Sequence, residues 1–203
     1  MNEATHIEHR DYTGAKLGMW LFLFTEILLF GGMFLLYSIY RDVNTADFHE
    51  AGKEMSVVIG AVNTIILLTS SLTMVLSIAA IKNNEKTRSI LFQAITIILG
   101  AAFLVNKYFE WSDHIRHGFY PNSPELLRMG HGKILFFGLY YVMTGIHGLH
   151  VLIGISVIGF VLALTLRGKV SSADFIKLEN TGLFWHLVDV IWIYLFPLFY
   201  LIT

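Results

Sequence analysis

Long apolar runs, separated by short polar segments, divide the chain into five similar parts. The runs cover residues 17–40, 56–81, 89–109, 134–166 and 183–202. Each reaches the roughly 20 residues that an α-helix needs to cross the hydrocarbon core of a bilayer. A soluble domain of this length cannot bury five such segments on every side. The pattern therefore predicts an all-α integral membrane protein, a bundle of five transmembrane helices in a single domain over residues 1–203.

The composition narrows the classes of function. Charged residues make up 14% of the chain, against about 25% in soluble domains. The absence of cysteine excludes disulfides, thiolate metal sites and iron–sulfur clusters in this chain. Net charge is −1, and no basic stripe indicates binding to nucleic acid. The polar N-terminal segment lacks the pattern of a cleaved signal peptide, so we expect the first span to persist in the mature protein.

The lysines and arginines between the spans predict the orientation, because these residues accumulate on the cytoplasmic side. With the N-terminus in the cytoplasm, the inner side collects eight of them and the outer side five. The inner set is Arg10, Lys16, Lys82, Lys86, Arg88, Arg167, Lys169 and Lys177, and the outer set is Arg41, Lys53, Arg116, Arg128 and Lys133. We therefore expect a multi-pass protein of the cell membrane with its C-terminus outside.

A single carboxyl, Glu26, lies about ten residues into the first apolar run, within FLFTEILLFGG. Its neighbours one helical turn away are apolar, and desolvation disfavours a charged carboxylate, so we expect a neutral glutamic acid near pH 7. Such a group can exchange protons or bind a lipid or a partner. It can equally do no more than hydrogen-bond to a neighbouring helix, and the residues alone leave these alternatives open.

Polar residues also occur in the second and third spans. The second contains NTIILLTSSLTM, whose small and hydroxyl-bearing residues suit close helix packing. The third ends in NKYFEWSDHIRHG, where Lys107 and Glu110 are three residues apart and can pair on one helix face. Tyr108 and Trp111 are typical of the membrane interface. We therefore expect an ordinary solvated helix end here, with Glu110 as the exception.

Three histidines lie well inside the apolar runs. His147 and His150 are three residues apart in MTGIHGLHVLIG, on one face of the fourth predicted helix. His186 and Asp189 have the same spacing in FWHLVDVIW, where the carboxyl can hold the imidazole in one tautomer. These histidines are candidates for metal or haem ligands, for a proton relay or for helix packing. The E-x-x-H pattern of a di-iron site is absent from the spans.

Together these segments resemble subunit III of the haem-copper oxidases, over about residues 15–202. The resemblance rests on YYVMTGIHGLHVLIG followed by GLFWHLVDVIWIYLFPLFYL. It also rests on LGMWLFLFTEILLFGGMF, which carries a glutamate as in that family, and on NTIILLTSSLTM and KYFEW in the same order. Five spans resemble the short form of the subunit, which lacks the first two helices. Two positions differ from many members of the family. Many members have another residue in place of Ile146, and many have glutamine in place of Lys107.

The resemblance implies an accessory, non-redox subunit of a proton-pumping terminal oxidase in aerobic respiration, either a cytochrome c oxidase or a quinol oxidase. Such a subunit carries no metal or cofactor of its own, because haem and copper belong to the catalytic subunit I and its companion subunit II. It stabilises the catalytic subunit, binds phospholipid and supports proton uptake. Glu26 then corresponds to the buried acid of the family, and no residue is catalytic. The resemblance further implies interhelical polar roles for His147, His150, His186, Asp189 and Glu110.

Three other functions stand as alternatives. One is the subunit III-like protein encoded with nitric oxide reductases. Another is a free-standing membrane metalloprotein that uses the three histidines of the spans, and the third is a transporter coupled through Glu26. The lack of cysteine, of E-x-x-H in the spans and of internal repeats weakens the last two.

Overall fold

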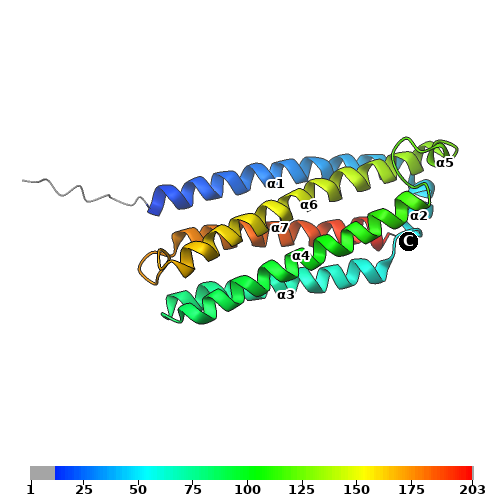
Figure 1. Cartoon of the computed structure of the whole chain (residues 1–203). Coiled ribbons are helices and arrows are strands. Elements are labelled where there is room, and N and C mark those ends of the chain that lie inside the picture. Colours follow the sequence, from blue (N-terminus) through cyan, green and yellow to red (C-terminus); the bar gives the residue numbers. More distant parts are fainter. Residues whose placement is uncertain (1–11, 203) are drawn as a thin grey trace, which may run out of the picture.

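The computed structural model describes residues 12–202, which form five long and two short α-helices (Figure 1). The long helices are α1 (Tyr12–Val43), α3 (Val57–Lys82), α4 (Lys86–Arg116), α6 (His131–Leu166) and α7 (Ile176–Tyr200). The short ones are α2 (Thr45–Gly52) and α5 (Pro124–Leu127), and no β-strand occurs in this part of the chain. All five long helices have the length and apolar composition to cross a membrane, which confirms the predicted fold class.

The helices extend beyond the apolar runs that predicted them. Helix α4 continues to Arg116 instead of ending at residue 109, and α7 begins at Ile176 instead of residue 183. Segment 45–52, which reads as part of a loop in the sequence, forms α2. Helix α6 has 36 residues, or about 54 Å at a rise of about 1.5 Å per residue. Because the hydrocarbon core is only about 30 Å thick, the ends of α6 must project beyond it or the helix must tilt.

Local sequence explains where several helices begin and end. Ser56 caps the start of α3, because its hydroxyl accepts a hydrogen bond from the N–H of Ile59 at 3.4 Å. Helices α3, α4 and α6 are each followed by a residue with positive φ, namely Asn84 (62°), Gly118 (78°) and Gly168 (72°). This left-handed residue turns the chain so that the next N–H reaches back to a free carbonyl of the last turn.

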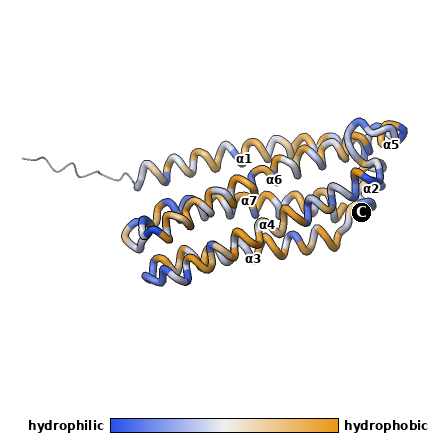
Figure 2. The backbone as a smooth tube through the Cα atoms, in the orientation of Figure 1, coloured by the Kyte–Doolittle hydropathy of each residue, from blue (hydrophilic) through white to orange (hydrophobic). Residues whose placement is uncertain are grey.

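The long helices pack side by side around α7. Helix α3 pairs with α4, α6 packs on α4 and α7, and α7 also contacts α1 and α3. The connections α3–α4 and α6–α7 lie at one end of the bundle, while α2, α5 and the C-terminal residues lie at the other (Figure 1). Hydrophilic residues gather at these two ends (Figure 2). Within the most apolar 18-residue stretch of each long helix, the buried share is 50% in α7 and 11% in α1. Helix α1 is therefore the most peripheral span.

Trp185 of α7 sets the spacing of the helices at the centre of the bundle. Its ring is fully buried, and its Nε1–H donates to the hydroxyl of Ser70 at 3.1 Å. Gly100 of α4 and Gly154 of α6 lie against this ring, so close that a Cβ at either position would be 2.8 or 2.7 Å from it. Because the hydrogen bond holds the indole in place, both helices need glycine where they pass it.

We expect Gly154→Ala to lower the free energy of unfolding by about 1–3 kcal/mol, the usual range for an overpacked core. The matched control is Gly159→Ala on the same helix, where no atom lies within 4 Å of the added Cβ. Thermal unfolding of the purified protein in mild detergent measures both. Equal midpoints for the two variants would contradict the close packing around Trp185.

Candidate functional site

Five ionisable side chains lie at mid-depth of the bundle, at several helix interfaces and far from both polar ends. Glu26 is near the middle of α1, His147 and His150 near that of α6, and His186 and Asp189 near that of α7. Each is buried or partly buried. Hydrocarbon offers no hydrogen-bonding partner at this depth, so a polar group there depends on partners within the protein.

Glu26 and His150 form a hydrogen-bonded pair between α1 and α6. The Oε2 atom of Glu26 lies 2.8 Å from Nε2 of His150, and the two side chains are 15% and 13% exposed. The edge of the His150 ring packs against Phe30, with ring centroids 5.4 Å apart. The helical neighbours of Glu26 in the sequence do not reveal this base, because His150 lies 124 positions further along the chain.

The geometry of His150 fixes the role of its Nδ1 atom and leaves Nε2 to share a proton with Glu26. Its Nδ1 lies 2.8 Å from the carbonyl oxygen of Ile146, and because a carbonyl oxygen only accepts, Nδ1 carries a hydrogen. Nε2 then either accepts a hydrogen bond from a neutral Glu26 or donates one, as imidazolium, to a carboxylate. In both forms one proton lies between Glu26 and His150, and it can move from one partner to the other without a change in the net charge of the pair.

His147 differs from the expected interhelical hydrogen-bonding residue. Its ring is fully buried, and neither ring nitrogen has a hydrogen-bond partner among residues 12–202. It packs instead on Phe103 and Trp192, with ring centroids 5.5 and 5.4 Å away. A spacing of three residues rotates it by about 60° from His150 around α6. His147 therefore faces α4 and α7, whereas His150 faces α1 and also contacts Phe184 of α7.

His186 pairs with a residue other than the expected Asp189. Its Nδ1 lies 2.6 Å from the hydroxyl oxygen of Ser71 on α3, and no hydrogen bond between His186 and Asp189 is found. Asp189 is 2% exposed. The neighbouring helix α3 supplies the closer partner, so His186 does have an interhelical hydrogen bond, but through Ser71.

Lys107 and Glu110 form a buried ion pair that joins three helices. Nζ of Lys107 lies 3.2 Å from Oε2 of Glu110, and 2.9 Å from the hydroxyl oxygens of both Tyr140 on α6 and Tyr200 on α7. The same hydroxyls donate to Oε1 of Glu110, that of Tyr140 at 2.6 Å. The cation also lies 4.8 Å from the centre of the Tyr140 ring. Every charge in the cluster is thus compensated by a charge or a hydroxyl.

The expectation of a solvated helix end is wrong for this part of α4. Lys107 is 7% exposed and Glu110 is 3% exposed. The buried residues of α4 follow each other at alternating steps of four and three: Ser89, Gln93, Thr96, Gly100, Phe103, Lys107, Glu110 and His114. Six of them carry polar side chains, so α4 turns its polar face inward and its apolar face outward. The spacing could have been found in the sequence, whereas Tyr140 and Tyr200 could not, because they come from distant segments.

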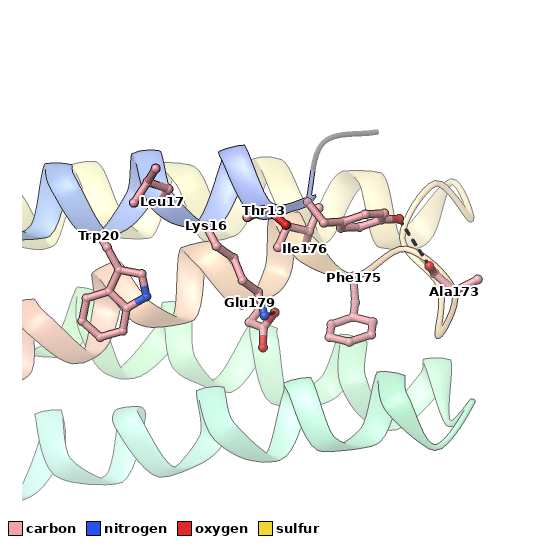
Figure 3. Close-up of a pocket in the computed structure, with 9 residues that line it drawn as sticks. Thr13, Lys16, Leu17, Trp20, Ala173, Phe175, Ile176 and Glu179 are labelled. Carbon is pink, nitrogen blue, oxygen red and sulfur yellow. Dashed lines mark hydrogen bonds and ion pairs between the residues drawn. The ribbon is translucent and has the colours of Figure 1, made fainter. Parts of the chain in front are cut away.

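A hollow of about 570 Å³ lies between the first turns of α1 and α7 (Figure 3). Lys16 reaches across it from α1 toward Glu179 of α7, with Nζ 3.0 Å from Oε2. Lys82 of α3 approaches the same carboxylate at 3.9 Å. Trp20 lines the hollow one turn further along α1 and is 60% exposed. The lining of the hollow therefore combines the Lys16–Glu179 ion pair with apolar side chains.

Comparison with known proteins decides the family. The family profile described as "Cytochrome c oxidase subunit III" matches residues 2–203. The chain belongs to this family. It is 37% identical to cytochrome c oxidase subunit 3 of Synechocystis sp., over 97% of this chain and 78% of that protein. It is 30% identical to quinol oxidase subunit 3 of Bacillus spizizenii, over 98% and 94% of the two chains.

A third relative has a longer chain. A protein of Aeropyrum pernix named heme-copper oxidase subunit I+III is 27% identical over 97% of this chain, which corresponds to 24% of that protein. Among residues 12–202, no group of three or more histidine, aspartate or glutamate side chains is arranged to hold a metal ion. In this member of the family, Glu26 and His150, Ser71 and His186, and the Lys107–Glu110 cluster form hydrogen bonds across helix interfaces.

Hydrophobic carbodiimides attack protonated carboxyls, and we expect them to label Glu26 at neutral pH. Glu26 shares a proton with His150 and is partly exposed, whereas the Glu110 side chain is 2% exposed and paired with Lys107. Peptide mapping after labelling in membranes locates the adduct, and Glu26→Gln should abolish it while leaving the fold intact. Labelling of Glu110 or Asp189 in place of Glu26 would show that this assignment is wrong.

Proposed function

We propose that this chain is the accessory, non-redox subunit III of a proton-pumping haem-copper terminal oxidase in aerobic respiration. The observation that carries the proposal is the family match over residues 2–203, which covers all five spans. The subunit stabilises the catalytic subunit, binds lipid and supports proton uptake. The relatives include both cytochrome c and quinol oxidase subunits, and the proposal holds for either electron donor, because haem and copper belong to other subunits.

The partner is the catalytic subunit I, with subunit II in the same complex. Support comes from the name of the Aeropyrum pernix relative, in which subunits I and III are parts of one protein. Two domains that are fused in one organism and separate in another commonly act together. Because α1 packs on the rest of the bundle along little of its surface, the chain also offers a large apolar area to such a partner.

The Glu26–His150 pair is the group through which this subunit supports proton uptake. It lies at mid-depth of the bundle, holds one exchangeable proton and remains partly exposed at the α1–α6 interface. A neighbouring carboxyl gives this imidazole a proton donor or acceptor inside the membrane.

Phospholipid binds in the hollow between the first turns of α1 and α7 (Figure 3). Lys16 lines the hollow with a side chain that is 49% exposed, so its ammonium is available to an anionic headgroup. Trp20 is 60% exposed and lies near the start of α1. Tryptophan is common at this level, between the lipid headgroups and the hydrocarbon. The apolar wall of the hollow leads from there into the hydrocarbon region.

The chain lies in the cell membrane with the first turns of α1 on the cytoplasmic side and the C-terminus outside. The lysines and arginines on which this orientation rests divide between the two ends of the bundle. Seven of the inner set lie in the described part of the chain, and the eighth, Arg10, lies outside it. The five lysines and arginines of the outer set lie at the other end. The inner end therefore carries more basic residues, as expected for the cytoplasmic side.

An affinity-tagged chain, isolated from its own membranes in mild detergent, should carry with it a larger haem-bearing subunit in about one-to-one ratio. Glu26→Gln should give the same ratio, because the pair lies between helices of this chain. A haem spectrum and native mass measurement report both. Recovery of the tagged chain alone, under conditions that preserve other respiratory complexes, would contradict the proposed function.

A further inference from the structure

The surface of α7 between α1 and α3 carries a polar group that faces out of the bundle. His186 is only partly buried there. Val190 and Ile193 follow it at four and seven residues, on the same helix face, and are 45% and 42% exposed. We call His186, Val190 and Ile193 the α7 strip. It runs along the middle of the membrane-spanning part of α7.

One ring nitrogen of His186 lacks a partner within the described residues. Nδ1 is hydrogen-bonded to Ser71, whereas Nε2 makes no hydrogen bond to residues 12–202. A polar nitrogen that faces lipid tails loses its hydrogen bond to water and gains nothing in exchange. Polar side chains within spans therefore face protein or a water-filled cavity as a rule. The partly exposed imidazole indicates a hydrogen-bonding group on another molecule at this depth.

The shape beside the strip fits a helix. A hollow of about 250 Å³ lies between α1 and α7, with a largely apolar lining that includes Ile27, Gly31, Val190 and Tyr194. No atom lies within 4 Å of the position that a Cβ on Gly31 would take. Val190 belongs both to this hollow and to the α7 strip, so the two form one continuous surface into which the side chains of a neighbouring helix can fit.

We propose that the α7 strip and the adjoining hollow bind a transmembrane helix of the catalytic haem-copper subunit, and that this helix presents a hydroxyl, amide or carboxyl group to Nε2 of His186. The proposal rests on the proposed function and specifies which face of this chain contacts the catalytic subunit. Lipid tails offer no hydrogen-bonding group at mid-depth, which favours a protein occupant. The relative that joins subunits I and III in one chain favours subunit I over a second copy of this chain.

Cross-linking in the assembled complex tests the face directly, because the chain has no cysteine of its own. Val190→Cys and Ile98→Cys each receive a thiol-specific benzophenone. Ile98 is the matched control: it also lies at mid-depth, on the outward face of α4, and is 66% exposed. We expect at least tenfold more photoproduct with the haem-bearing subunit from Val190 than from Ile98.

The other outcomes overturn the proposal in distinguishable ways. Equal or greater yield from Ile98, or a Val190 product that contains only lipid or a second copy of this chain, shows that another face binds the catalytic subunit. If no haem-bearing subunit accompanies the unlabelled chain at all, the proposed function fails as well.

Substitutions of His186 test the hydrogen bond itself. An interhelical hydrogen bond in a membrane corresponds to about a threefold change in affinity. We expect His186→Leu to weaken retention of the chain in the complex by about that factor in a detergent titration. His186→Gln should retain it, because the amide can still hydrogen-bond, and so should Ser71→Ala, which leaves the imidazole in place. Equal weakening by His186→Leu and His186→Gln, or no weakening by either, would overturn this part of the proposal.

Discussion

The buried ion pair between Lys107 and Glu110 is the contact on which the arrangement of one half of the bundle, the half nearer α2 and the C-terminus, depends. Removing two charges from water is costly, and the cost is offset only where each charge has a partner of good geometry. Here the hydroxyls of Tyr140 and Tyr200 contact both the ammonium and the carboxylate. Because these four side chains come from α4, α6 and α7, the pair can form only when the three helices are in register.

The same constraint orients the rest of α4 and, through it, the middle of the bundle. With Lys107 and Glu110 inward, every third or fourth residue of α4 also points inward, down to Gly100, Thr96 and Ser89. Gly100 then lets α4 close on Trp185, while Gly154 does the same for α6. Helix α6 in this position carries His147 into the core and His150 to α1. The Glu26–His150 pair thus depends on a helix register that is fixed some distance away.

The sequence predicts those features that repeat along one helix. The five spans, the depth of Glu26 and the three-residue spacing of Lys107 and Glu110 are visible as runs and intervals, and the structure confirms the spans and the Lys107–Glu110 pairing. The partners across helices are not visible in that way. His150 for Glu26, Ser71 for His186, and Tyr140 and Tyr200 for Lys107 lie 33 to 124 residues from the groups they bind. Periodicity gives the face of a helix, but the neighbour of that face follows only from the packing of the whole bundle.

A double-mutant cycle on the ion pair tests this dependence most directly. The free energy of unfolding in mild detergent is measured for Lys107→Met, Glu110→Gln and the double variant. Lys107→Met leaves a buried carboxylate without its cation, so it should cost about 3–5 kcal/mol. The double variant should be more stable than Lys107→Met alone, because an amide replaces the unpaired charge and still accepts from both tyrosines. Additive losses in the double variant would show that the two side chains do not stabilise each other, and would contradict the account.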